Sequence, residues 1–318
     1  MQPRVLITDD VHPYLIEGLS ALGYAVEYQP LISFEDTMQQ ITPYVGLVVN
    51  SKIRVDDLLL DQAPHLIWVG RLGSGLDIFD LPACARRGVA VINSPEGNAN
   101  AVAEQALGML LALQNNLLRA DREVRQFTWQ REANRGVELA GKRIGIYGFG
   151  NNGSQFARKL AGMEMEVWAY DKYKTDYLDD FPYVAEKQGE DLFECDVISL
   201  HLPLTDETHH LVNRSFLDQC RPGAILINTS RGSIVNTADL VEALESGRLK
   251  GACLDVFENE KPATMTAQEL AVYSRLYALD QVVLSPHIAG WTRESKYKIA
   301  QVLVDKIRQG LQNRTFIR

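Results

Sequence analysis

Short apolar runs rich in Val, Ile and Leu alternate along the chain with longer segments whose apolar residues recur at the helical period. This alternation is typical of β-α-β units and predicts parallel sheets covered by helices. The first third predicts helices near Tyr14–Leu22 and Phe34–Ile41, and strands at Val5–Thr8, Gly46–Asn50, Leu66–Gly70 and Val89–Asn93. A second series of strands is expected at Arg143–Tyr147, Glu166–Tyr170, Val197–Leu200, Ala224–Asn228, Gly251–Val256 and Val282–Ser285. The pattern therefore predicts an α/β fold with two doubly wound parallel sheets.

Two helical patterns frame the second series of strands. Residues from Asn98 to Arg125 contain few helix breakers and predict one long helix with an apolar face. An amphipathic helix after Trp291 lies beyond the last strand, so we expect it to pack on the first domain. Six strands joined by helices make a complete dinucleotide-binding domain. We therefore expect a Rossmann domain of residues 98–290, inserted into a flavodoxin-like outer domain of residues 1–97 and 291–318.

Composition and charge exclude several classes of protein. The 318 residues carry a net charge of -9 and no clustered basic face, which argues against nucleic-acid binding. The N-terminal MQPRVLITDD is too briefly apolar for a signal peptide, and no later segment approaches a membrane span. We therefore expect a cytoplasmic protein with no membrane partner. The four cysteines are widely spaced, which predicts small buried residues and no disulfide frame or metal site.

A glycine-rich turn follows the first strand of the second series. The sequence KRIGIYGFGNNG places Gly148, Gly150 and Gly153 in a GxGxxG spacing between a strand and a helix. In this context the first glycine permits a tight turn, the second lets backbone approach a pyrophosphate, and the third lets helix and strand pack closely. The helix N-terminus, with Asn151 and Asn152, offers free N–H groups to the phosphates. The turn therefore predicts a dinucleotide site.

Asp171 favours NAD over NADP at this site. It closes the next predicted strand, eighteen residues beyond Gly153. A carboxylate there accepts hydrogen bonds from the ribose 2′- and 3′-hydroxyls and repels a 2′-phosphate. The neighbouring Lys172 and Lys174 oppose that preference. The alternative interpretation is a sharp strand–helix turn followed by an ordinary surface aspartate.

Polar residues follow three later strands, in the segments NTSRG, LDVFENEKP and LSPHIAGWT. The carboxyl ends of parallel strands are where open α/β sheets bind ligands. Arg231 can hold a carboxylate in a fork geometry, and His287 can accept a hydroxyl proton as hydride leaves the substrate carbon. Glu260 would orient the imidazole if the two are paired. The residues alone leave open a surface ion pair for Arg231 and an ordinary hydrogen-bonded histidine for His287.

The order of GxGxxG, Asp171, HLPLTDET, NTSRG, DVFENE and SPHIAG resembles the D-isomer-specific 2-hydroxyacid dehydrogenases over nearly the whole chain. The resemblance implies two α/β domains, NAD as cofactor, and a catalytic set of Arg231, Glu260 and His287. It also implies that Asp255 contacts the cofactor near the nicotinamide. The remaining residues expected to line the cofactor site are His201, Pro203 and Thr229.

The segment VGRLGSGLDIFD matches the substrate loop of that family, where N–H groups around Ser74 and Gly75 would hold the substrate carboxylate. The loop is similar to that of D-3-phosphoglycerate dehydrogenases, which makes Arg71 a candidate for a bidentate phosphate contact. The alternative is an arginine that only rims the cleft. The loop lacks the asparagine usual in that subfamily, and Asn151 stands where an arginine is common. The chain stops at Arg318 without a regulatory domain, so we expect no serine feedback.

Three functions remain open at this stage. The leading hypothesis is NAD-dependent oxidation of D-3-phosphoglycerate in serine synthesis, and the second is reduction of hydroxypyruvate, glyoxylate or another small 2-keto acid. C-terminal-binding-protein corepressors share the fold and the same Arg, Glu and His, but this chain lacks their long disordered extension. In the family, the helix in GNANAVAEQALGMLLAL carries much of a homodimer interface. We therefore expect a small-molecule substrate and a homodimer formed through residues 98–130.

Overall fold

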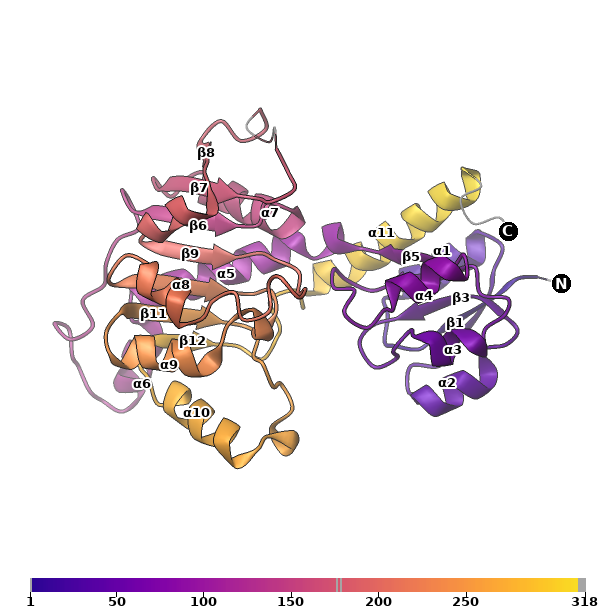
Figure 1. Ribbon diagram of the computed structural model, residues 1–318, viewed down its shortest axis with the longest axis horizontal. Coiled ribbons are helices and arrows are strands. Elements are labelled where there is room, and N and C mark those ends of the chain that lie inside the picture. The colour runs from indigo at the N-terminus through magenta and orange to yellow at the C-terminus, as the bar shows by residue number, and fades with distance from the viewer. Residues whose placement is uncertain (1, 176, 178, 314–318) are drawn as a thin grey trace. The chain divides into compact units, whose positions relative to one another are not determined.

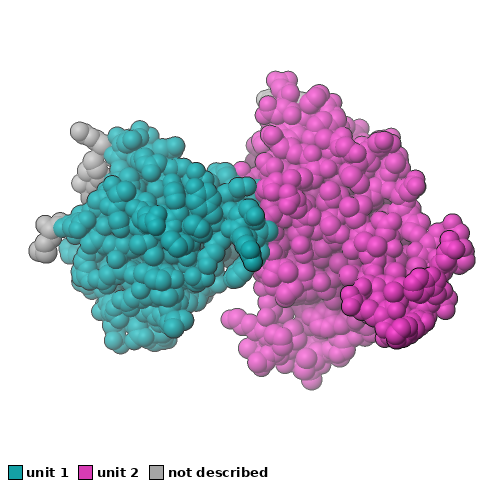
Figure 2. Space-filling model, turned by 180° about the vertical axis from the view of Figure 1, so that it is seen from behind, with its two compact units in different colours: residues 1–99, 291–318 teal, residues 100–290 magenta. Residues whose placement is uncertain are grey.

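The computed structural model describes residues 2–175, 177 and 179–313, and the chain forms two compact units (Figure 2). Unit 1 comprises residues 1–99 and 291–318, and unit 2 comprises residues 100–290. Each unit is a fully parallel sheet with helices on both faces, so the predicted fold class is confirmed (Figure 1). Among the residues described, no helix combines the length and apolar composition needed to cross a membrane.

Unit 1 is built on five strands in the order β2-β1-β3-β4-β5, the flavodoxin-like arrangement. Its strands are β1 (Arg4–Ile7), β2 (Ala25–Tyr28), β3 (Tyr44–Val49), β4 (Trp68–Arg71) and β5 (Ala90–Asn93). Its helical elements are α1 (Pro13–Ala21), α2 (Phe34–Gln40), α3 (Asp57–Asp61), α4 (Leu81–Arg86), the 3-10 turn η1 (Pro95–Gly97) and α11 (Arg293–Gln312).

Two apolar clusters cover the two faces of the unit 1 sheet. On one face Leu15 of α1 and Leu303 of α11 pack around the fully buried Trp68. On the other face Leu59 of α3 and Cys84 of α4 pack against the sheet. The amphipathic helix at the end of the chain is therefore part of the unit 1 core. The sequence pattern missed β2 because this edge strand, AVEY, is only half-buried and has no apolar run.

Unit 2 is built on seven strands in the order β12-β11-β10-β9-β6-β7-β8. Its strands are β6 (Arg143–Tyr147), β7 (Glu166–Tyr170), β8 (Val184–Glu186), β9 (Val197–Leu200), β10 (Ala224–Asn228), β11 (Leu249–Leu254) and β12 (Val282–Leu284). Its helices are α5 (Ala99–Gln114), α6 (Leu117–Arg125), α7 (Asn151–Leu160), α8 (Arg214–Gln219), α9 (Thr237–Glu245) and α10 (Ala267–Tyr277). The sequence missed β8, which is an edge strand of three residues.

The long helix expected from Asn98 to Arg125 is divided into α5 and α6. Asn116 adopts a left-handed backbone with φ of 52°, a conformation that asparagine tolerates better than most residues. The helical period continues through this position, so the pattern gave no sign of the break. In unit 2, α5 and α7 cover one face of the sheet and α8, α9 and α10 cover the other.

The strand register brings the carboxyl ends of six strands of unit 2 into one row. Across the sheet, paired residues at these ends are Tyr170, Tyr147, Leu200, Asn228, Leu254 and Leu284. The residues that directly follow them in the sequence are Asp171, Gly148, His201, Thr229, Asp255 and Ser285. The predicted cofactor residues therefore share one edge of the sheet, the edge at which open α/β sheets bind ligands.

Candidate active site

The glycine turn after β6 has the geometry that a dinucleotide needs. Gly148 has φ of 94°, and a Cβ there would lie 2.5 Å from the His201 carbonyl oxygen. A Cβ at Gly153 would lie 2.0 Å from the Gly148 oxygen, so only glycine fits at either position. Gly150 caps α7 without a side-chain hydrogen bond, and a Cβ there would meet no atom within 4 Å. The start of α7 is thus open to an anion, which its N–H groups and dipole would attract.

Three buried side-chain atoms at this edge have no hydrogen-bond partner among the described residues. They are Asn152 Oδ1, His201 Nδ1 and Thr229 Oγ1, and all three belong to residues expected to bind the cofactor. Desolvation lowers the pKa of His201 to about 3, so its ring is neutral, and Nε2 lies 2.9 Å from Ser199 Oγ. Buried polar atoms without partners are costly, and a polar ligand can supply the missing bonds. Pro203 follows in the same loop, where its carbonyl accepts a hydrogen bond from Thr208.

Asp171 organises the turn after β7 as well as occupying the predicted ribose position. One carboxylate oxygen accepts the Phe149 N–H at 2.7 Å, and the other accepts the N–H groups of Tyr173 and Lys174 at 2.9 and 3.0 Å. A carboxylate offers about four acceptor positions, so roughly one remains for a ribose hydroxyl. Asp171 therefore builds the turn after β7, and its contact with a ribose remains a prediction.

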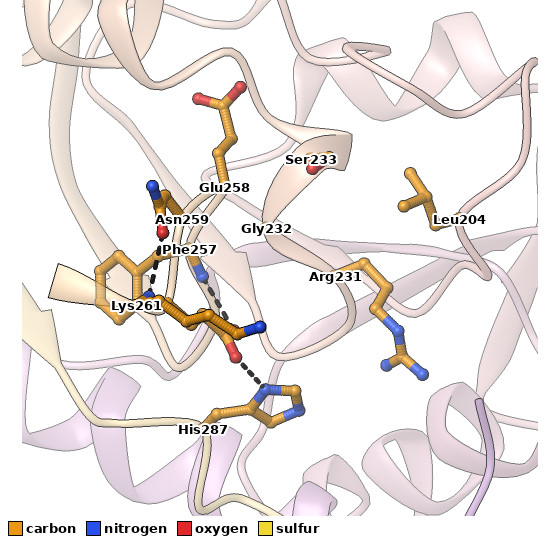
Figure 3. A pocket seen from close by; sticks show the side chains of 10 residues that line it. Leu204, Arg231, Gly232, Ser233, Phe257, Glu258, Asn259, Lys261 and His287 are labelled. Atoms are coloured by element: carbon orange, nitrogen blue, oxygen red, sulfur yellow. Dashed lines mark hydrogen bonds and ion pairs between the residues drawn. The ribbon is translucent and has the colours of Figure 1, made fainter. Parts of the chain in front are cut away.

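Arg231, Glu260 and His287 line one pocket of about 310 Å³ in unit 2 (Figure 3). His287 Nδ1 lies 2.8 Å from Glu260 Oε2, and Glu260 Oε1 accepts the Phe257 N–H at 3.3 Å. The Arg231 guanidinium donates to the Ser230 carbonyl at 2.7 Å through Nη1. The remaining pocket residues are Leu204, Gly232, Ser233, Phe257, Glu258, Asn259 and Lys261. An acid, a base and a guanidinium from three separate loops thus meet in one place.

The Glu260 carboxylate is ionised beside the imidazole. Partial burial raises the pKa of Glu260, but the hydrogen bond and charge of His287, the Phe257 N–H and the Arg231 charge together lower it below its usual value. An ionised carboxylate accepts, so His287 Nδ1 donates to it. The other ring nitrogen, Nε2, is then the one without the proton when the imidazole is neutral.

The backbone of His287 is held in an unusual conformation by Asp255. His287 has φ of 56°, in the left-handed region, and its N–H donates to the Asp255 carbonyl at 2.7 Å. The fully buried Asp255 carboxylate accepts the N–H groups of Ile288 and Ala289 at 2.9 and 2.8 Å, and the Ser285 hydroxyl at 2.5 Å. In the structure, therefore, Asp255 builds the turn that presents His287. Its expected cofactor contact remains a prediction.

The predicted substrate loop follows β4 in unit 1. Arg71 Nε donates to the Gly75 carbonyl at 3.0 Å, and Nη1 donates to Asn50 Oδ1 at 2.5 Å and to the Leu72 carbonyl. The Arg71 guanidinium thus stabilises the substrate loop through hydrogen bonds to its backbone. The backbone N–H groups of Ser74 and Gly75 donate no hydrogen bond within the described residues, so both are available to an anion.

Residues 107–289 match the family described as D-isomer specific 2-hydroxyacid dehydrogenase, NAD binding domain. The chain belongs to this family. The matched domain is an NAD-binding domain, and the glycine turn, the open start of α7 and the unpartnered atoms of Asn152, His201 and Thr229 fit a dinucleotide.

Relatives of this chain have names that refer to different substrates. The chain is 32% identical over 315 residues to "D-3-phosphoglycerate dehydrogenase" of Archaeoglobus fulgidus. The matched region covers 96% of this chain but only 56% of the Archaeoglobus protein. The chain is 36% identical over 275 residues to "Hydroxypyruvate reductase" of Thermotoga maritima, covering 86% and 87% of the two chains. The structure of D-lactate dehydrogenase from Aquifex aeolicus with NAD and lactic acid superposes with a TM-score of 0.84 at 27% identity, covering 98% and 96%.

Sequence reasoning missed several residues that build this site. Ser285 donates to Asp255, and Tyr273 of α10 accepts the Asn259 N–H at 3.0 Å in the loop that carries Glu260. Glu258 lines the pocket, and its carboxylate bonds with the His210 ring. Nothing local in the sequence distinguishes His210 from the adjacent His209. Its partner is 48 residues away, and only the fold brings the two together.

Proposed function

We propose that the protein oxidises a D-2-hydroxy acid, with His287 as general base, Glu260 as the group that orients it, and Arg231 as the carboxylate ligand. The observation that carries this assignment is the 2.8 Å contact between His287 Nδ1 and Glu260 Oε2 in the pocket that Arg231 also lines. Because Glu260 accepts the hydrogen bond from Nδ1–H, Nε2 is the ring nitrogen that remains to exchange a proton with the substrate. Ser74 and Gly75 of the substrate loop would hold the substrate carboxylate through their N–H groups.

The chemistry is a two-electron oxidation of an alcohol to a ketone. Bound NAD supplies the hydride acceptor. His287 Nε2 takes the hydroxyl proton while the C2–H bond breaks and the C–O bond becomes a carbonyl. Arg231 holds the carboxylate or the developing carbonyl in its fork, which orients C2. In the reverse direction the same imidazole, protonated, returns the proton to the carbonyl oxygen.

Within this class, the proposed substrate is D-3-phosphoglycerate. The similarity to the Archaeoglobus protein of that name supports the proposal, although the chain spans only 56% of it. Reduction of hydroxypyruvate or glyoxylate is the second candidate, favoured by the Thermotoga protein, of which the match covers 87%. The bonds of Arg71 to Gly75, Asn50 and Leu72 also favour this candidate, because a phosphate contact would compete with them.

Steady-state kinetics with a panel of acids distinguishes these candidates. With NAD we expect kcat/KM for D-3-phosphoglycerate to exceed that for D-glycerate and D-lactate at least roughly tenfold, the effect of one charge-assisted contact. Equal values would eliminate the phosphate proposal, and fast reduction of hydroxypyruvate with NADH would then favour the second candidate. If no acid is turned over while calorimetry still detects NAD binding, an NAD-responsive scaffold becomes the better interpretation.

We further propose a homodimer formed through residues 98–130. In α6 no residue is buried, and apolar side chains on and after this helix are exposed, with Phe127 at 97% and Trp129 at 74%. Large exposed aromatic residues are typical of surfaces that meet a partner. Sedimentation velocity should give a dimer of the 35.6 kDa chain and a monomer for Phe127→Asp. A monomeric parent protein at micromolar concentration would contradict the proposal.

A further inference from the structure

His210 lies between the segment that follows Arg231 and the segment that carries Glu260. Its N–H donates to the Ser233 carbonyl at 2.8 Å, two residues after Arg231. Its ring Nε2 lies 2.6 Å from Glu258 Oε1, two residues before Glu260. One residue therefore bonds through its backbone to one catalytic segment and through its side chain to the other.

The Glu258 carboxylate makes a second connection between the segment that follows Arg231 and the segment that carries Glu260. While Oε1 bonds with His210, Oε2 accepts the N–H of Thr237, the first residue of α9, at 2.8 Å. Figure 3 shows the Glu258 side chain directed away from His287. Glu258 thus anchors one end of the pocket loop to α9, while Glu260 in the same loop bonds with His287.

The backbones of the two catalytic segments are in direct contact at Gly232. A Cβ on Gly232 would lie 1.9 Å from the Phe257 carbonyl carbon and 2.5 Å from the Glu258 nitrogen. The residue after Arg231 therefore rests directly on the loop that leads to Glu260. Any rotation of this loop changes the position of Glu260 relative to Arg231.

The backbone of His210 is in the left-handed region, which is uncommon for a residue other than glycine. Its φ is 49°, and the Asn213 side chain, which caps α8, donates to its carbonyl at 3.0 Å. A residue other than glycine stays in this region only where several surrounding interactions hold it there, and such residues are concentrated at functional sites. The adjacent His209 is exposed and stacks on the His210 ring with centroids 4.1 Å apart.

We propose that His210 and Glu258 act as positioning residues, which set Glu260, and through it His287, at the working distance from Arg231. The inference rests on the proposed function of Arg231, Glu260 and His287. His210 and Glu258 take no part in the proton transfer. Their bonds decide how closely the loop of residues 257–261 follows the segment after Arg231.

The variants His210→Ala and Glu258→Ala remove the two halves of this link. Misplacement of a reacting group by about 1 Å costs up to about a hundredfold, so we expect kcat to fall by about ten- to a hundredfold. The KM for NAD should not change, because neither side chain belongs to the glycine turn. The limb of the kcat/KM profile that reports the His287–Glu260 pair should move in the direction that Glu260→Gln moves it.

Two further variants separate positioning from general damage to the fold. His210→Gln keeps a donor of similar reach at the same strained backbone position, so it should recover most of the kcat that His210→Ala loses. His209→Ala removes the stacked neighbour without touching Glu258, and it should behave as the parent protein does. The charged groups that line the pocket with His287, which are Arg231, Glu258, Glu260 and Lys261, all remain in His210→Ala and His210→Gln.

Crystal structures of the parent protein and His210→Ala test the proposal independently of turnover. We expect the distance between His287 Nδ1 and Glu260 Oε2, 2.8 Å here, to exceed about 3.5 Å in the variant, which is beyond hydrogen-bond range. An unchanged distance would overturn the positioning role, as would a parental pH profile in both alanine variants. If the parent protein turned over no 2-hydroxy acid, the proposed function would fail, and the measured distance would still decide the role of His210.

Discussion

Replacing Glu260 by Gln removes the negative charge beside His287 and keeps the shape of the side chain. The lowered pKa of Glu260 means that the carboxylate is ionised throughout the pH range in which an imidazole titrates. In the parent protein this charge stabilises the protonated imidazole. Oxidation requires the proton-free ring, so the acidic limb of kcat/KM for oxidation should move to lower pH.

The size of this shift follows from the exposure of the pair. The two side chains are 45% and 38% exposed and 2.8 Å apart. Fully exposed ion pairs contribute about 0.2–1 kcal/mol, and hydrogen bonds to charged groups contribute about 1.5–3 kcal/mol. For a half-exposed pair we take about 1 kcal/mol, and a difference of one pH unit corresponds to about 1.36 kcal/mol. The acidic limb should therefore be displaced by less than about one pH unit.

The assay is the pH dependence of kcat/KM in both directions. In Glu260→Gln the acidic limb of oxidation and the basic limb of reduction should both move to lower pH, because reduction needs the protonated ring. The variant Glu260→Asp keeps the charge and retracts it, so it should lower kcat with a smaller displacement of the limbs. Limbs that stay in place in Glu260→Gln would refute the pairing of Glu260 with the catalytic base.

Three further outcomes follow from the site. His287→Ala should lower kcat by a factor of about 10² to 10⁴, the usual loss of a general base, with NAD binding by calorimetry unchanged. Asp171→Asn should raise the ratio of kcat/KM for NADP over NAD by about ten- to a hundredfold, because it removes the charge that repels a 2′-phosphate. Arg71→Ala should lower kcat/KM for phosphorylated and unphosphorylated acids by similar factors, because its bonds hold the loop around Ser74 and Gly75. A loss confined to the phosphorylated acid would instead identify Arg71 as a phosphate ligand.

Much of the fold is predictable from the sequence because apolar periodicity reports burial. The central strands of both sheets are buried on both faces and appear as apolar runs, and all six strands predicted for unit 2 are present. The pattern fails at the sheet edges, where β2 and β8 are half-buried or only three residues long. It also fails at Asn116, where one left-handed residue divides a helix without interrupting the period of its neighbours.

The residues of the site were predictable where they follow the carboxyl ends of parallel strands. Arg231, Glu260 and His287 each come soon after a strand, and parallel strands place such residues on one edge. What the sequence could not give is the set of partners, because hydrogen bonds over 27 to 48 residues depend on the fold. Asp255 illustrates the gap, since its bonds with Ser285, Ile288 and Ala289 exist only once β11 and β12 lie side by side.

The position of His287 depends on the carboxylate of Asp255, which takes no part in the proposed proton transfer. A non-glycine residue in the left-handed region costs on the order of 1–3 kcal/mol, and His287 has φ of 56°. Asp255 supports this backbone through three hydrogen bonds to its buried carboxylate, from the Ser285 hydroxyl and the N–H groups of Ile288 and Ala289. These bonds hold the turn in the conformation in which the imidazole contacts Glu260. Activity and local stability are linked at Asp255, which acts on the backbone of His287, whereas Glu260 acts on the imidazole directly through a hydrogen bond.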